Sequence, residues 1–367
     1  MKVIKDKRIV VGVSGGVDSI VSLVLLKKQG YTPIAVSLAL PIWESPKNID
    51  KENACCTIDS LALVSSVCKS LDINHYIYDV KKQFKETVVK YFLKELKNGR
   101  IPNPCIYCNL EHKIKHLIEW ADLNGIEKIA TGHFASKKYN QKTKKYELVE
   151  SKDKEKDQTY MLSMLPQEWI KRMEFPISSK TKQEVCIIAG ENNLDVFVKK
   201  KQSQDFCFAN RSSLTEFIKE SLGKNPGPII DEDGKYLGEH KGLWFYTRGQ
   251  RKGLGFPEKY FVKDFNRDKN IIYVTKKQTP ISSKEINVID YSFIEGNDFL
   301  KNKKEIKLKA KIRYGQEKQD CLLYPDIKKK KLKVIFKNPQ KFVTIGQFCV
   351  FYKGKVCLGG GIIDSFK

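Results

Sequence analysis

The segment that most constrains this chain is an apolar run followed by a glycine turn, close to the N-terminus. Ile9–Gly12 reads as a buried strand, and the apolar spacing of Ile20–Gln29 predicts a helix. Between them, Ser14–Ser19 combines two adjacent glycines with two serines and one aspartate. Glycine lets the backbone approach a ligand closely, and the free N–H groups at a helix N-terminus attract anions. The segment therefore predicts a phosphate-binding loop.

Two common phosphate-binding motifs are excluded by the spacing of this loop. A Walker loop requires a lysine before its last serine or threonine, but Asp18 precedes Ser19. The dinucleotide fingerprint requires glycines at other intervals. The loop instead resembles the PP-loop of the ATP pyrophosphatase superfamily, whose members split ATP into AMP and pyrophosphate. A strand-to-helix turn whose small residues serve packing alone is the competing interpretation.

The charge of the chain indicates a polyanionic partner. Lysine and arginine total 67 against 43 acidic residues, a formal net charge of +24. Such an excess favours binding to phosphate-rich partners, although a lysine-biased genome would also produce it. No apolar stretch approaches the about 20 residues that cross a bilayer, and Met1–Arg8 is too charged for a secretory signal. We expect a soluble, cytoplasmic monomer.

The order of strand-like and helix-like segments predicts the fold class. A chain of 367 residues is too long for one ordinary core. Up to about residue 135 the two kinds of segment alternate, which predicts a parallel α/β sheet with ligands at the carboxyl ends of its strands. Short β-rich runs follow from about residue 205. We expect a catalytic α/β domain over 1–204, a central β-rich domain over 205–282 and a C-terminal β-barrel over 283–367.

Cysteines provide the second candidate chemistry. Cys105 and Cys108 have C-x-x-C spacing at the end of the loop 99–109, which its two prolines are expected to keep irregular and non-helical, just before a helix expected over Leu110–Asn124. A helix N-terminus lowers a thiol pKa, so we predict a thiolate nucleophile there, with Cys207 as a third candidate. A structural zinc site is the alternative and would need further ligands such as Cys55 and Cys56, which are otherwise unassigned. The remaining cysteines are expected to be small core residues: Cys68, Cys186, Cys321, Cys349 and Cys357.

Further motifs spread over the chain carry a family resemblance. They are residues 14–19, 99–109, 130–133, 156–160, 204–208, 226–228, 245–255 and 346–361. Those at 248–255 (RGQRKGLG) and 356–361 (VCLGGG) are the most specific. On these motifs the chain resembles the bacterial tRNA-specific 2-thiouridylase family. Its members add sulfur to the wobble uridine of tRNAs for Glu, Gln and Lys in an ATP-dependent reaction.

The resemblance implies a role for each matching residue. ATP would lie on Gly12, Val13, Ser14, Gly15, Gly16, Val17, Asp18 and Ser19, with Leu38 and Gly132 near the adenosine. The target base would contact Asn103, Pro104 and Cys105. The tRNA would contact His133, Lys156, Asp157, Gln158, Arg313, Tyr314 and Gln347. Cys108 matches the nucleophile, and Cys207 matches the residue that carries persulfide sulfur from a relay protein or a cysteine desulfurase. Asp18 is the candidate Mg²⁺ ligand, with helix capping as its simpler role.

One residue departs from the commonest form of the family motif. Many members have aspartate where this chain has Cys105, which weakens an acid–base role at that position. The three cysteines Cys105, Cys108 and Cys207 could instead hold a 4Fe–4S cluster, so persulfide and cluster chemistry both stay open. Two other functions also remain: an ATP-dependent amidotransferase or ligase resembling GMP synthetase, and a non-catalytic RNA-binding protein.

Overall fold

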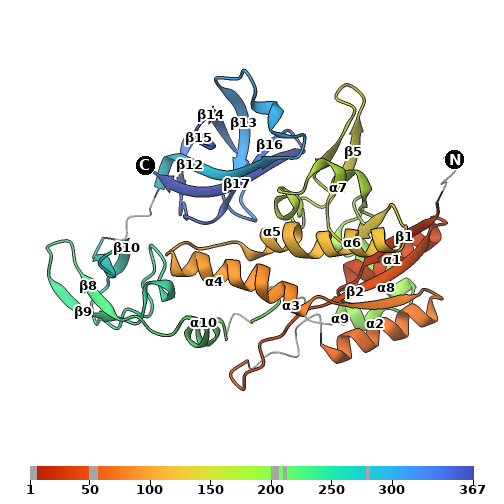
Figure 1. The fold of residues 1–367 in the computed structure, drawn as a ribbon, viewed down its shortest axis with the longest axis horizontal. Helices are drawn as coiled ribbons and strands as arrows, with labels where there is room; N and C mark the ends of the chain where they lie inside the picture. The colour runs from red at the N-terminus through yellow and green to blue at the C-terminus, as the bar shows by residue number, and fades with distance from the viewer. Residues whose placement is uncertain (1–5, 49–56, 200–205, 210–212, 278–281) are drawn as a thin grey trace.

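The computed structural model describes residues 6–48, 57–199, 206–209, 213–277 and 282–367. Figure 1 shows a parallel sheet with its helices at one end of the molecule and a smaller β-sheet at the other. A β-barrel lies above the helices that run between them. The expected fold class, a parallel α/β domain followed by β-rich and barrel parts, is confirmed.

The N-terminal part is built on a five-stranded parallel sheet with the order β3-β2-β1-β4-β7. Its strands are β1 (Arg8–Gly12), β2 (Thr32–Ala39), β3 (His75–Asp79), β4 (Ile129–Thr131) and β7 (Met173–Glu174). Because β2 and β4 flank β1 on opposite sides, the strand order reverses at β1. The carboxyl ends of β1 and β4 therefore frame the crevice in which such sheets bind ligands.

Helices cover both faces of this sheet. One apolar cluster, with Ile20 and Val185 among its buried members, joins α1 (Val17–Lys28), α2 (Ile58–Ser70), α8 (Lys182–Glu191) and α9 (Asp195–Lys199) to one face. A second cluster, which includes Leu117, joins α6 (Ile114–Leu123), η4 (Thr159–Leu162) and α7 (Gln167–Arg172) to the other. Ile9 and Val11 belong to the first cluster and Val10 to the second. This alternation is what a strand buried on both faces requires.

The segment between β3 and β4 is helical almost throughout. It contains α3 (Lys81–Phe84), η2 (Lys85–Val89), α4 (Lys90–Lys97), α5 (Pro104–Cys108) and η3 (Asn109–Lys113) before α6. The expected start of the last helix at residue 110 is wrong, because the helix begins at Pro104. Proline is favoured in the first turn, where its missing N–H is not needed.

The C-terminal part is a closed antiparallel barrel of β12-β15-β14-β13-β16-β17, closed by the β12–β17 pairing. Its strands are β12 (Ser282–Phe293), β13 (Ile306–Lys311), β14 (Gln319–Asp326), β15 (Lys331–Lys341), β16 (Phe348–Lys353) and β17 (Val356–Phe366), with η6 (Asn297–Leu300) after β12. The hairpin of β5 (Ser136–Asn140) and β6 (Lys145–Val149), which belongs to the N-terminal part, pairs with β17. Backbone hydrogen bonds therefore join the two parts.

The central part has the four-stranded order β10-β11-β8-β9. Its strands are β8 (Gly227–Ile230), β9 (Tyr236–His240), β10 (Phe261–Asn266) and β11 (Ile271–Thr275), with η5 (Leu243–Phe245) between β9 and β10. The expectation of short β-rich runs from residue 205 missed the helix α10 (Leu214–Leu222), which precedes the sheet. Cys186 is also only half-buried, whereas the other cysteines expected in the core are buried.

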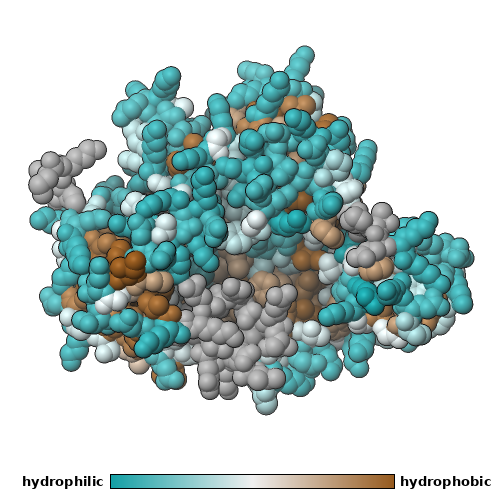
Figure 2. All heavy atoms as spheres, turned by 180° about the vertical axis from the view of Figure 1, so that it is seen from behind, coloured by the Kyte–Doolittle hydropathy of each residue, from teal (hydrophilic) through white to brown (hydrophobic). Residues whose placement is uncertain are grey.

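The surface is largely hydrophilic on the face shown in Figure 2, with apolar side chains exposed mainly toward its left edge. Within the described parts of the chain, no helix is both long and apolar enough to cross a membrane.

One close backbone contact connects the carboxyl end of β4 to the glycine turn. A Cβ atom on Gly132 would lie 2.6 Å from the backbone N of Ser19 and 2.7 Å from the backbone C of Asp18. Only glycine fits this approach, which therefore fixes the distance between β4 and the first turn of α1.

We expect the Gly132→Ala variant to lose about 1–3 kcal/mol of unfolding free energy, because the added methyl group must displace backbone rather than a side chain. Urea denaturation measures this loss. Gly190→Ala is the matched control, since its Cβ would lie 3.5 Å from Asp195 Oδ1, an ordinary contact. Equal stability of the two variants would contradict the account.

Candidate active site

The glycine turn has the local geometry of an anion-binding loop. Ser14 N donates to Ser19 Oγ (3.2 Å), which in turn donates to the carbonyl of Gly16 (2.8 Å). Gly15 has a positive φ of 73°, and Gly16 is the N-cap residue of α1 without a side-chain capping bond. The first turn of α1 thus has no side-chain cap, although Ser19 N donates to the carbonyl of Gly16 (3.2 Å), and N–H groups at such an end favour an anion.

Asp18 does not cap the helix but forms an ion pair with a residue that the sequence analysis missed. Lys182 Nζ lies 2.5 Å from Asp18 Oδ1, and its side chain is 15% exposed. Lys182 is the first residue of α8, and its backbone N donates to Asp153 Oδ2 (2.8 Å). A lysine at the start of a helix, far along the chain, carries no sequence signal of its own. The pair places the ammonium group of Lys182 beside the glycine turn.

Cys105 and Cys108 lie inside a helix rather than in the predicted irregular loop. Asn103 is the N-cap of α5, and its Oδ1 accepts hydrogen bonds from Cys105 N (3.1 Å) and Ile106 N (3.3 Å). Asn103 and Pro104 therefore start the helix instead of preventing it. The two thiols are one helical turn apart, and a π-helical turn, η3, follows directly.

Burial controls the ionisation of the predicted nucleophile. Cys108 is 5% exposed, and removal from water raises the pKa of its thiol to about 12; Lys113 lowers this pKa, and Cys207 and Cys105 raise it. Cys105 is exposed as a residue, yet loss of hydration around its sulfur raises the pKa of that thiol to about 11. The expected low thiol pKa at the helix N-terminus is therefore wrong for this conformation.

The three thiols lie near one another. The charge of Cys207 contributes to the raised pKa of both Cys105 and Cys108. Cys108 and Cys207 also belong to one apolar cluster, which includes Leu40 at the end of β2. The helix of the C-x-x-C pair and the chain segment of Cys207 thus meet beside the carboxyl end of the parallel sheet.

Aromatic side chains hold the Cys207 segment, which we define as residues 206–209. The rings of Phe206 and Phe208 stack at 5.7 Å between centroids, and each lies 5.4 Å from the ring of Phe92 on α4. The backbone N of Trp43 donates to the carbonyl of Phe208 (3.2 Å). The segment is therefore fixed by packing on one side and by a backbone hydrogen bond on the other.

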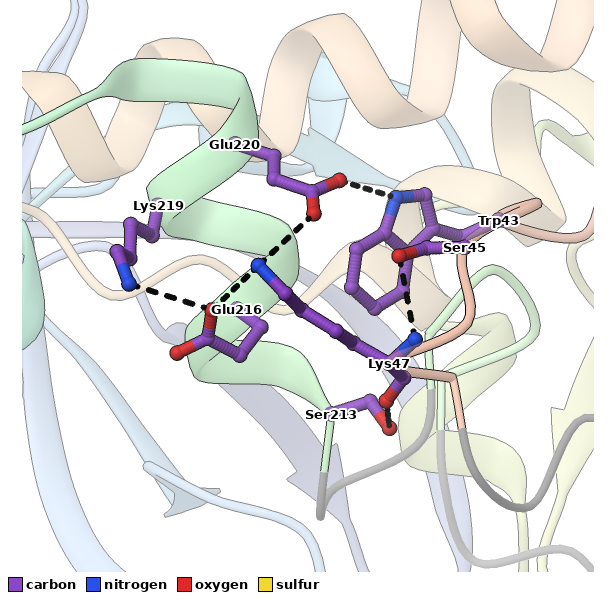
Figure 3. Close-up of polar contacts among 7 residues, drawn as sticks. All are labelled: Trp43, Ser45, Lys47, Ser213, Glu216, Lys219 and Glu220. Carbon is purple, nitrogen blue, oxygen red and sulfur yellow. Dashed lines mark hydrogen bonds and ion pairs between the residues drawn. The ribbon is translucent and has the colours of Figure 1, made fainter.

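A group of polar contacts, which we call the clasp, ties the segment after β2 to α10 (Figure 3). Lys47 Nζ lies 3.2 Å from Glu216 Oε2 and 3.4 Å from Glu220 Oε1. Trp43 Nε1 donates to Glu220 Oε2 (3.1 Å), and Ser213 Oγ donates to the carbonyl of Lys47 (2.8 Å). Since Trp43 also bonds the Cys207 segment, the clasp connects that segment to the central part of the chain.

Successive contacts lead from the glycine turn to the thiols. Gly132 lies against Asp18 and Ser19, and His133 follows it directly. Burial is the main cause that lowers the pKa of His133 to about 3, and the charge of Lys113 adds to it. The same lysine lowers the thiol pKa of Cys108. The carboxyl end of β4 thus lies against the glycine turn, and Lys113, which follows the C-x-x-C helix, influences both His133 and Cys108. Leu38 is half-buried on β2.

The residues expected to contact tRNA differ in exposure. Lys156 is exposed, but Asp157 is buried and its oxygens accept from Ser151 N (3.1 Å) and Thr159 Oγ1 (2.6 Å). Asp157 thus shapes its loop from within. Gln158 bonds the backbone of Phe134 through both its own N and its Oε1.

In the barrel, the three expected tRNA contacts lie on loops. Arg313 and Tyr314 are exposed after β13. Gln347 Nε2 donates to the carbonyls of Ile101 (2.9 Å) and Pro102 (3.2 Å). The barrel thereby holds the backbone that leads into Asn103 and the C-x-x-C helix.

The described residues hold no preassembled metal site at the thiols. Across the described residues, no three or more histidine, cysteine, aspartate or glutamate side chains are grouped so that they could hold a metal ion. Cys105, Cys108 and Cys207 therefore do not form a ligand set for an iron–sulfur cluster in this conformation. Cys55 and Cys56, the extra ligands of the zinc interpretation, lie outside the described residues.

Comparison with known proteins identifies the family. The tRNA-specific 2-thiouridylase MnmA 1 of Caldanaerobacter subterraneus subsp. tengcongensis is 39% identical over 366 residues, which cover 98% of both chains. The tRNA-specific 2-thiouridylase MnmA of Acetivibrio thermocellus is 38% identical over 364 residues, covering 98% of this chain and 99% of the relative. The corresponding protein of Halothermothrix orenii is 39% identical over 365 residues, again covering 98% and 99%. The chain belongs to the tRNA-specific 2-thiouridylase family.

Family descriptions also match the successive parts of this 2-thiouridylase family member. Residues 7–211 match the tRNA methyl transferase HUP domain, which contains the glycine turn, the C-x-x-C helix and the Cys207 segment. Residues 215–276 match the tRNA methyl transferase PRC-barrel domain. Residues 283–363 match the aminomethyltransferase beta-barrel domain.

We expect Lys47→Met to open the clasp and to increase amide hydrogen exchange in the Cys207 segment and α10. The ion pairs of Lys47 are 36–51% exposed, so their loss should cost little stability and leave the fold intact. Hydrogen exchange followed by mass spectrometry measures the change. Lys219→Met is the matched control, because Lys219 pairs with Glu216 within α10 itself. Equal exchange in both variants would argue against the clasp.

Proposed function

We propose that this protein transfers sulfur to C2 of a uridine in tRNA, in a reaction driven by cleavage of ATP to AMP and pyrophosphate. The observation that carries this proposal is the meeting of a phosphate-binding loop with two cysteines from distant parts of the chain. The curated relatives named tRNA-specific 2-thiouridylase, which match almost the whole chain, support the same substrate and product.

The chemistry explains why one crevice needs both features. The C2 carbonyl oxygen of uridine is a poor leaving group. Attack of this oxygen on the α-phosphorus of ATP expels pyrophosphate and makes AMP the group that leaves next. Backbone N–H groups of the glycine turn and the charge of Lys182 would stabilise the pyrophosphate as it departs.

Magnesium ion fits the chemistry of Asp18. The ion prefers carboxylate, phosphate and water oxygens, and it commonly binds through one protein carboxylate together with substrate phosphates. Asp18 supplies such a carboxylate at the glycine turn, where it pairs with Lys182. When bound, the ion would neutralise phosphate charge. In its presence Lys182 would be free to turn from Asp18 toward the phosphates.

Sulfur transfer then uses the two cysteines in different roles. Cys207 would carry the sulfur as a persulfide, loaded by a sulfur-donor protein. The terminal sulfur attacks C2, and AMP leaves with the former carbonyl oxygen. Cys108 then attacks Sγ of Cys207, the bond to the transferred sulfur breaks, and 2-thiouridine is released. If Cys108 attacks first, it releases sulfide that adds to C2. Both orders end with a Cys108–Cys207 disulfide.

The tRNA would be held by charge and would present an unstacked base. The formal charge of +24 favours phosphate contacts whose affinity falls with added salt. The anticodon loop is single-stranded, so its wobble base can leave the stack at low cost. Asn103, Pro104 and Cys105 would meet that base. The other expected tRNA contacts would surround that base: His133, Lys156, Gln158, Arg313, Tyr314 and Gln347. Asp157 would stabilise the loop that carries Lys156 and Gln158 through its hydrogen bonds with Ser151 and Thr159.

A direct assay tests this function. Unmodified tRNA, ATP, Mg²⁺ and a persulfide donor are incubated with the protein, and the digested tRNA is analysed for 2-thiouridine. We expect one AMP per thiolated uridine, and no product from Cys108→Ser or Cys207→Ser, because a hydroxyl cannot carry or accept sulfane sulfur. Both variants should still bind tRNA.

Cys186→Ser, at a half-buried cysteine on α8, is the control and should keep full activity. Thiolation by either of the other two variants would contradict the cysteine roles. ATP cleavage coupled to an amine acceptor instead of tRNA would indicate an amidotransferase or ligase.

A further inference from the structure

The proposed reaction leaves a product that the protein must undo in every turnover. The Cys108–Cys207 disulfide is two electrons more oxidised than the two thiols, and it must be reduced before Cys207 can be loaded again. Cys108 is 5% exposed, and the bond would lie within the apolar cluster beside Phe92 and Phe208. Thiol–disulfide exchange requires access to a sulfur atom, and the Cys108 end of this bond is buried while the Cys207 end is half-buried, so a reductant in solution has restricted access to it.

We propose that Cys105 is a redox relay that carries electrons from a dithiol reductant in solution to this buried disulfide; the inference rests on the proposed function. Cys105 is exposed, Cys207 is half-buried and Cys108 is buried. Cys105 is therefore the most exposed residue of the three, and it is the one that neither carries nor releases sulfur in the proposed transfer. Its position in C-x-x-C spacing places it beside the buried end of the bond.

The geometry allows exchange between Cys105 and Cys108. Residues three apart in a helix have Cβ atoms about 5–6 Å apart, and disulfides need about 3.5–4.5 Å. An adjustment of about 1–2 Å within a single helical turn closes this gap. The mutual influence of Cys105, Cys108 and Cys207 on their thiol pKa values is further evidence that the three sulfurs are neighbours.

The relay balances in two exchanges. The Cys105 thiolate attacks Sγ of Cys108, a Cys105–Cys108 disulfide forms, and Cys207 leaves as a thiolate that takes up a proton. Cys207 is then free for the next persulfide. A dithiol in solution next attacks Sγ of Cys105, the more exposed residue of the pair, Cys108 leaves as a thiolate, and the second thiol of the reductant releases Cys105. The protein gains two electrons, and the reductant becomes a cyclic or protein disulfide.

The test follows reduction directly and does not need thiolation activity. The Cys108–Cys207 disulfide is formed in the full chain with diamide. Limiting dithiothreitol is then added, and samples are quenched by acid and alkylation for peptide mass spectrometry. In the wild-type chain we expect a transient Cys105–Cys108 disulfide together with alkylated Cys207. In Cys105→Ser we expect no such intermediate and at least a tenfold slower reduction of the disulfide.

Cys186→Ser makes the same chemical change elsewhere and should reduce at the wild-type rate. In steady-state thiolation, the ratio of turnover rate to first-turnover amplitude should fall in Cys105→Ser and not in Cys186→Ser. Equal reduction rates in the wild-type chain and Cys105→Ser, or no Cys105–Cys108 disulfide in the wild-type chain, would overturn the relay. The Cys105–Cys108 disulfide is trapped in the wild-type chain itself, so this part of the test does not depend on whether Cys105→Ser folds. Loss of thiolation by the wild-type chain would instead refute the proposed function.

Discussion

The close approach of Gly132 to the first turn of α1 is the constraint on which the site depends. A parallel sheet whose strand order reverses at β1 leaves a crevice between the carboxyl ends of β1 and β4. A Cβ atom on Gly132 would lie only 2.6 Å from Ser19 N. The backbone after β4 therefore packs directly against the backbone at the start of α1. The charge of Lys113, the last residue of η3, contributes to the lowered pKa of His133, the next residue after Gly132. This packing fixes the carboxyl end of β4 against the glycine turn, on the side of the sheet where the proposed nucleotide site lies.

Burial, more than helix position, governs the thiols before substrate binds. A helix N-terminus favours an anion by about 0.3–2 kcal/mol. Moving the pKa of Cys108 from 9.0 to about 12 corresponds to roughly 4 kcal/mol in the opposite direction. The cluster that buries Cys108 is the same one that holds the Cys207 segment, so positioning and protection come from one set of aromatic contacts. Burial therefore disfavours the thiolate of Cys108 in this conformation.

Sequence reasoning predicted the architecture well and the environment of the site poorly. The glycine turn, the parallel sheet and the β-rich C-terminal half follow from periodicity and turn residues, which act locally. The helical start at Pro104 was missed because the two prolines were interpreted as helix breakers, whereas Asn103 caps a helix that begins with Pro104. The prediction of a low pKa for the Cys108 thiol was wrong because its burial by Phe92 and the Cys207 segment depends on packing between segments that are distant in the sequence. Lys182 reaches Asp18 across 164 positions of sequence, and no local pattern reports such a contact.

The central claim is that an activated uridine and the sulfur carrier meet in the crevice at the end of β1 and β4. A crystal structure of the protein with a non-hydrolysable ATP analogue and unmodified tRNA measures this most directly. The account predicts that O2 of the flipped uridine lies about 3–3.5 Å from the α-phosphorus, which is bound at the glycine turn. It also predicts the sulfur of Cys108 or Cys207 facing C2 of the same base. A uridine bound elsewhere on the protein, with both sulfurs remote from its C2, would contradict it.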